Sequence, residues 1–118
     1  MRAYERFLNY VQVWTTSDET SDTVPSAERE RVLARMLAEE MKEMGISDAR
    51  VDDKGYVYGH IPATEGYEGK PALGLIAHMD TAPDASGENI KPRIIEDYDG
   101  GDVKLGDSGK VLSTADFP

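Results

Sequence analysis

The chain of 118 residues contains no cysteine, so it can form neither a disulfide framework nor a metal site built on thiolates. Basic residues are also scarce, because 13 Lys and Arg face 23 Asp and Glu and leave a net charge of -10. This balance excludes a generic nucleic-acid binder, which needs a basic patch, and argues against binding to an anionic membrane surface. The length is that of one domain.

Long hydrophobic runs are missing as well. No apolar run approaches the roughly 20 residues of a membrane-spanning helix. The N-terminal segment 1–6 lacks the apolar centre of a signal peptide. These two absences predict a soluble, cytoplasmic protein.

Two N-terminal segments carry apolar residues at helical spacing and predict two helices. Residues 4–13 form the first, with one apolar face packed on the body of the protein. The second follows Ser26, a plausible N-cap, and ends at Gly45, a typical residue just beyond a helix. Its apolar stripe consists of Val32, Leu33, Met36, Leu37, Met41 and Met44.

The remaining chain predicts strands and turns. Residues 49–61 and 103–112 each have the pattern of a β-hairpin. Residues 73–77 are a short apolar run that predicts a buried central strand, and residues 93–95 predict a short one. Two helices followed by a mixed sheet indicate the first part of an α/β fold, which is incomplete because no helix follows the central strand.

His78 and Asp80 directly follow the predicted central strand, within the sequence His-Met-Asp-Thr-Ala-Pro. Side chains alternate along a strand, so the two groups should project from one face at its carboxyl end, where α/β sheets bind ligands. A neutral imidazole binds a metal through one nitrogen, while a carboxylate on the other nitrogen fixes its orientation. The pair therefore suggests a metal ligand with a supporting acid, although a hydrogen-bonded structural histidine gives the same short pattern.

The segment around His78 resembles the first metal-binding motif of the co-catalytic zinc aminopeptidases and carboxypeptidases. Other stretches have the order and spacing of that group, and together they look most like its peptidase T branch of bacterial tripeptide aminopeptidases. The stretches are Glu5-Arg6-Phe7-Leu8-Asn9-Tyr10-Val11, Val24-Pro25-Ser26, Glu43-Met44-Gly45, residues 78–84 and Gly100-Gly101-Asp102. The resemblance covers essentially the whole chain.

This resemblance implies that residues 1–118 are the N-terminal portion of a three-layer α/β/α catalytic domain. It implies that His78 binds one of two zinc ions and that Asp80, counted among the catalytic residues, holds the imidazole. It also implies release of the N-terminal residue from tripeptides, with the other ligands and a glutamate base further along than this chain extends. Because zinc normally takes three or four protein ligands, we expect the 118-residue chain alone to be inactive and to bind zinc weakly.

Several alternatives stay open. The same scaffold could carry a dipeptidase or a hydrolase of acylated amino acids. The chain could instead be a non-catalytic interaction module that self-associates through an exposed sheet edge and apolar patches. His60 could be a second ligand, but no carboxylate lies two residues from it, so a surface or packing role is favoured.

Two further motifs are interpreted as ordinary turns. Gly106-Asp107-Ser108-Gly109 resembles the nucleophile loop of serine proteases, but the chain is too short for two β-barrels and a triad needs a base placed to activate the serine. Residues 97–102 faintly resemble the start of a calcium loop, but the glycine is misplaced and Ser108 stands where the bidentate glutamate belongs. Both segments therefore predict solvent-exposed turns.

Overall fold

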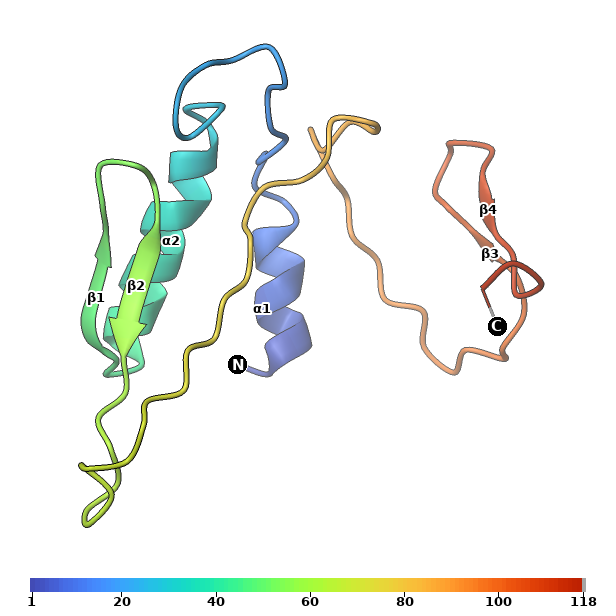
Figure 1. Cartoon of the computed structure of the whole chain (residues 1–118). Helices are drawn as coiled ribbons and strands as arrows, with labels where there is room; N and C mark the ends of the chain where they lie inside the picture. Colours follow the sequence, from blue (N-terminus) through green and yellow to red (C-terminus); the bar gives the residue numbers. More distant parts are fainter. Residues whose placement is uncertain (118) are drawn as a thin grey trace.

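A computed structural model describes residues 1–117, so the predicted unit of residues 1–118 ends at Pro118, which lies outside the described residues. The described chain forms two helices and two small sheets (Figure 1). These elements are, in chain order, α1 (Ala3–Tyr10), α2 (Glu30–Glu43), β1 (Ser47–Val51), β2 (Val57–His60), β3 (Val103–Lys104) and β4 (Val111–Leu112). The α/β character is as predicted, and both predicted hairpins form.

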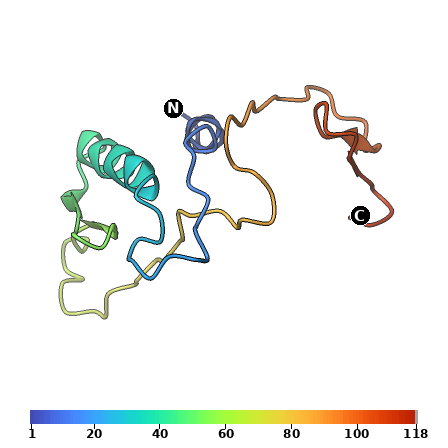
Figure 2. The same cartoon turned by 90° about the horizontal axis from the view of Figure 1, so that it is seen from above.

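The strands pair as two separate antiparallel hairpins, β1–β2 and β3–β4. In the first hairpin, Arg50 is paired with Tyr58 and Val51 with Val57. The predicted mixed sheet is therefore not assembled within residues 1–117. Seen from above, the β3–β4 hairpin stands well apart from α2 and the β1–β2 hairpin (Figure 2).

Helix α2 ends as the sequence predicts, at a glycine with left-handed backbone. Gly45 has a φ of 76°, and its N–H donates to the carbonyl of Lys42 at 2.9 Å. The N–H of Ile46 donates to the carbonyl of Met41, also at 2.9 Å. This pair of bonds satisfies carbonyls that the helix end would otherwise leave free.

The start of α2 differs from the prediction. The helix begins at Glu30, after single turns over the preceding residues, and Ser26 is not its N-cap. The Ser26 hydroxyl instead accepts a hydrogen bond from the backbone N–H of Asp18 at 2.9 Å and donates to the Glu30 carboxylate at 2.8 Å. Ser26 thus connects the preceding loop to the helix and is not available for the first-turn N–H groups.

Helix α2 packs on the β1–β2 hairpin through small residues. The buried apolar residues within residues 1–117 are Ala27, Leu33, Ala34, Ala38 and Ala49. Gly59 makes the approach possible, because a Cβ added there would lie 3.1 Å from Sδ of Met41 in α2 and 2.7 Å from Cγ2 of Ile46 just after the helix. The predicted apolar stripe was partly wrong: Val32 and Met44 are about half exposed, since the closest contact with the hairpin falls on the alanines.

Helix α1 is joined to α2 by polar side chains. None of its residues is buried. The Tyr10 hydroxyl donates to the Glu40 carboxylate, whose other oxygen lies 3.3 Å from a guanidinium nitrogen of Arg6. Tyr4 and Phe7 are exposed, while Leu8 and Val11 are half-buried, so the expected packing of an apolar face on the body is only partial among the described residues.

The predicted central strand, residues 73–77, is not a strand in this structure. The segment is extended but forms no ladder, and Leu73, Leu75 and Ile76 are 85%, 88% and 101% exposed. A buried strand needs neighbours on both edges to satisfy its backbone and cover its side chains, and no other strand among residues 1–117 lies beside it. Residues 93–95 likewise form no strand, because no strand among residues 1–117 pairs with them.

Candidate metal-binding site

His78 and Asp80 lie at the end of the extended segment and contact each other. Nδ1 of His78 is 3.0 Å from Oδ1 of Asp80. The two side chains therefore lie on the same side, as predicted. Their side chains are 83% and 42% exposed, respectively, so the pair is open to solvent and not enclosed in the apolar core.

This contact determines which nitrogen of the imidazole is free. An ionised carboxylate can only accept hydrogen bonds, so the proton of a neutral His78 belongs on Nδ1. Nε2 then keeps its lone pair and can bind a metal ion. The assignment of His78 as a ligand and of Asp80 as its supporting acid stays a prediction.

Thr81 attaches this segment to the loop between α1 and α2. Its N–H donates to the carbonyl of Thr15 at 3.2 Å, and its carbonyl accepts from the N–H of Ser17 at 3.0 Å. These bonds form an isolated parallel bridge between Thr81 and Thr16. Asp80 therefore directly precedes a residue whose backbone is held by two hydrogen bonds.

The bridge has its own supporting contacts. The hydroxyls of Thr16 and Thr81 are 3.2 Å apart, and Nε of Arg29 donates to the Thr16 carbonyl at 2.7 Å. The Arg29 guanidinium also lies over the Trp14 ring, 4.4 Å from its centroid, an arrangement that favours a cation–π interaction. Trp14 thus helps to hold the Arg29 side chain beside the bridge.

The structure does not add further ligands to the pair. Within residues 1–117, no group of three or more His, Asp or Glu side chains could hold a metal ion. His60 lies exposed at the end of β2 and is not part of such a group. The donor set of the described residues therefore fits one ligand of a zinc site with its supporting acid, and it does not fit a complete site.

The other motifs have the local roles expected of turns. The Ser108 hydroxyl donates to the carbonyl of Leu105 and accepts from the N–H of Lys110, at 2.5 and 3.1 Å. In the acidic turn, the Asp99 carboxylate accepts from the N–H of Gly101 at 2.9 Å. Both sets of bonds are local to their own turns.

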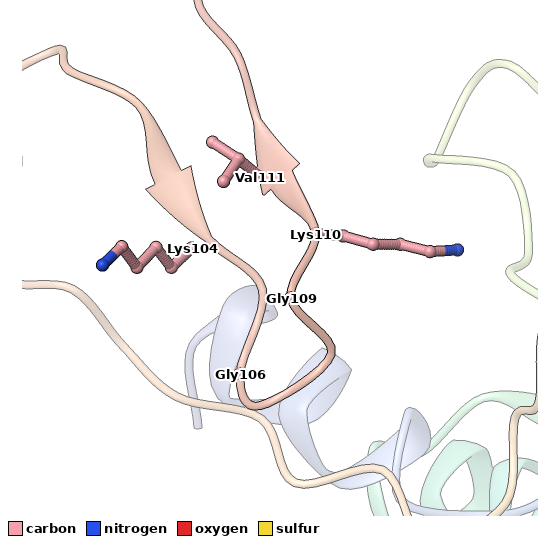
Figure 3. Close-up of a pocket in the computed structure, with 5 residues that line it drawn as sticks. All are labelled: Lys104, Gly106, Gly109, Lys110 and Val111. Carbon is pink, nitrogen blue, oxygen red and sulfur yellow. The ribbon is translucent and has the colours of Figure 1, made fainter.

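A shallow hollow beside the β3–β4 hairpin has no converging polar groups. It is lined by Lys104, Gly106, Gly109, Lys110 and Val111. Figure 3 shows that the two lysine side chains extend to opposite sides of the hairpin, away from each other. The hollow therefore offers no cluster of groups that could bind an anion, and it includes neither His78 nor Asp80.

Sequence reasoning missed the residues around the bridge. Thr16, Thr81 and Gly87 were not singled out, and Arg29 was counted only as part of a helix. The contact between Thr16 and Thr81 spans 65 positions, and no periodicity connects residues so far apart. The one available signal was the position of Thr81 directly after Asp80.

Comparison with known proteins finds several similar proteins that share one name. No family model matches the chain. Peptidase T of Caldanaerobacter subterraneus subsp. tengcongensis is 49% identical over 118 residues, covering 99% of this chain. Peptidase T of Clostridium acetobutylicum is 50% identical over 115 residues and that of Aliivibrio fischeri 48% over 114, each covering 97% of this chain.

Over nearly its whole length the chain is therefore similar to peptidase T. It spans 28–29% of the length of the curated peptidase T relatives named above. This extent agrees with the predicted N-terminal fragment of peptidase T. No helix among residues 1–117 is long and apolar enough to cross a membrane.

Proposed function

We propose that this chain is part of a cytoplasmic, two-zinc aminopeptidase that removes the N-terminal residue from tripeptides. The observation that carries the proposal is the His78–Asp80 contact, with Nε2 left free, in a chain about half identical to curated peptidase T proteins. In the complete protein, residues 1–118 would belong to a three-layer α/β/α catalytic domain. Short peptides would be its partners, and neither nucleic acid nor a membrane would be.

In this proposal His78 would bind one of the two zinc ions through Nε2, and Asp80 would hold the imidazole through Nδ1. Bound zinc would supply Lewis-acid activation of water for peptide hydrolysis. The free position of Nε2 and the exposure of the pair support these roles. The remaining ligands and the general base would come from polypeptide outside these 118 residues, so the chain alone would be inactive.

The test is an activity assay on a complete protein that carries this segment. Trialanine, dialanine and N-acetylalanine distinguish a tripeptide aminopeptidase from the two alternatives on the same scaffold, a dipeptidase and an acylamino-acid hydrolase. We expect release of alanine from trialanine in a zinc-dependent manner and its loss in His78→Ala. Faster turnover of either other substrate would replace the proposal with that alternative.

The 118-residue chain can be tested directly with zinc. With one imidazole donor, we expect calorimetry to detect only weak binding, and this binding should disappear in His78→Ala. His60→Ala is the matched control, because His60 is the other histidine of the chain and lies exposed at the end of β2. Tight one-to-one binding would require a ligand set other than the one proposed.

A second candidate function is a non-catalytic interaction module. Such a module would use the exposed apolar segment 72–77, which forms no ladder within residues 1–117. Such a module would form a defined oligomer and show no metal-dependent peptidase activity. The trialanine assay distinguishes it from the enzyme.

A further inference from the structure

Apart from the chain connection at residues 61–62, the part of the described chain that carries His78 and Asp80 is hydrogen-bonded to the rest at one residue. Within residues 1–117, every hydrogen bond that crosses from residues 62–117 to residues 1–61 involves Thr81. Figure 1 shows the extended chain after β2 meeting the loop between α1 and α2 at this point. The direction in which Asp80 and His78 point relative to α2 and the first hairpin is therefore set at Thr81.

Thr16 is the centre of this attachment. It is 8% exposed, and its neighbours Thr15 and Ser17 hold the carbonyl and N–H of Thr81 from both sides. The Thr16 hydroxyl also faces Gly87, where an added Cβ would lie 2.6 Å from Thr16 Oγ1 and 3.0 Å from Thr81 Oγ1. The loop that follows the candidate site thus closes on the two threonine hydroxyls.

Arg29 connects Thr16 to helix α2. Its side chain donates to the carbonyls of Thr16 and Ser17, at 2.7 and 3.5 Å, and it is itself the residue that precedes the helix. A guanidinium presents several donors in one plane, so it can hold two successive carbonyls at once. The helix, the loop and the candidate site are in this way joined through one side chain.

We propose that Thr16 and Arg29 are positioning residues that, through Thr81, orient the His78–Asp80 pair. Without the bridge the backbone of Asp80 would be free to rotate, and the contact between its carboxylate and Nδ1 of His78 would be populated less often. The inference rests on the proposed function, because a fixed orientation of His78 matters for function only if His78 binds a metal. The geometry itself does not depend on bound metal.

Thr16→Val tests the proposal in the 118-residue chain, because valine keeps the shape of threonine and removes the hydroxyl. The amides of Ser17 and Thr81 should exchange with solvent about tenfold faster, as expected for a weakened local structure. At alkaline pH, nitrogen NMR should show less of the His78 tautomer with the proton on Nδ1. Thr16→Ser should restore both values.

The tautomer separates positioning from a purely structural role. A bridge that only holds the two halves together would change amide exchange and leave the His78 tautomer as it is, and that result would overturn the proposal. Thr64→Val is the matched control, because Thr64 is exposed and its hydroxyl forms no hydrogen bond to any of residues 1–117. It should change neither amide exchange at the bridge nor the tautomer.

Gly87→Ala gives an independent test if Thr16→Val does not fold. The added Cβ should push the two hydroxyls apart and lower the Nδ1 tautomer in the same direction, while Gly69→Ala, with nothing within 4 Å of its added Cβ, should not. An unchanged tautomer in Gly87→Ala would overturn the proposal. Zinc titration of the unsubstituted chain tests the metal role separately, so failure of zinc binding would leave the positioning result standing.

Discussion

The carboxylate of Asp80 selects the nitrogen of His78 that stays free. It lies 3.0 Å from Nδ1, and an ionised carboxylate accepts but cannot donate. The same contact also limits rotation of the ring. At the scale of the residue, one acid therefore controls both the tautomer and the direction of the imidazole, and both matter for metal binding.

Removing this acid should weaken metal binding more than it disturbs folding. In a complete protein that carries this segment, Asp80→Ala should lower zinc affinity about tenfold to a hundredfold, the usual effect of losing a group that orients a ligand. Competition with a chelating dye measures the affinity. Asp84→Ala is the control, since Asp84 is a nearby exposed acid, and it should bind zinc as the unsubstituted protein does. Equal affinities in the two variants would contradict the role given to Asp80.

At the scale of the element, the end of α2 depends on a backbone conformation that only glycine adopts without strain. Gly45 has a φ of 76°, and an added Cβ would meet nothing within 4 Å. Gly45→Ala should therefore destabilise the protein by about 1 kcal/mol through the backbone alone. Urea unfolding followed by circular dichroism measures this. Gly69→Ala, also free of clashes but without a positive φ, should cost nothing.

The stability that the Tyr10–Glu40 contact between α1 and α2 provides should be lost at alkaline pH. Burial raises the pKa of Tyr10 above its ordinary value of 10.0, and the hydrogen bond to Glu40 raises it further. A raised pKa means that the folded protein holds the proton more tightly than the unfolded chain. The contribution is complete below pH 10 and is lost as pH rises from about 10 through the folded pKa.

Tyr10→Phe tests this dependence, because phenylalanine keeps the ring and removes the titrating group. Urea unfolding at several pH values between 8 and 11 should show a steeper loss of stability above about pH 10 in the unsubstituted chain than in Tyr10→Phe. Tyr58 also has a raised pKa, with burial as the largest cause, and it is present in both proteins, so its effect cancels in the comparison. Parallel curves would show that the Tyr10–Glu40 contact does not contribute.

The elements that the sequence predicted well are those fixed by local signals. Glycine at the end of α2, and turns with glycine in both hairpins, determine backbone conformation within a few residues. The start of α2 was wrong because Ser26 binds Asp18 and Glu30 in place of the helix N–H groups. The strand at 73–77 was wrong for a different reason: an apolar run predicts burial, but burial requires neighbours that residues 1–117 do not supply.

The same distinction applies to the candidate site. The side-by-side arrangement of His78 and Asp80 follows from their spacing of two residues, which sequence alone can reveal. Their attachment through Thr16 and Thr81 does not, because it depends on a contact between segments 65 positions apart. Arg29 illustrates the limit further: its position before α2 gave no indication that its side chain holds the loop beside the site.

The whole molecule is much more open than its length requires. Its radius of gyration is 18.1 Å, whereas a compact domain of this length has about 13.5 Å. Its accessible surface is 9652 Å², against about 6,300 Å² for a folded monomer of the same mass. Much of the apolar surface that a compact domain would bury therefore remains exposed, most completely at residues 72–77.

The chain should consequently self-associate through residues 72–77. This segment lies within a stretch that has no charged residue between Lys70 and Asp80, so two copies can approach there despite the net charge of -10. Ile76→Lys would place like charges in the paired strands and should weaken association about tenfold or more. Sedimentation velocity over a range of concentrations measures this, with Tyr67→Lys, an exposed aromatic position outside the segment, as the control. A monomer at high concentration in the unsubstituted chain would show that the exposed segment is not an association surface, and equal weakening by both lysines would place the contact elsewhere.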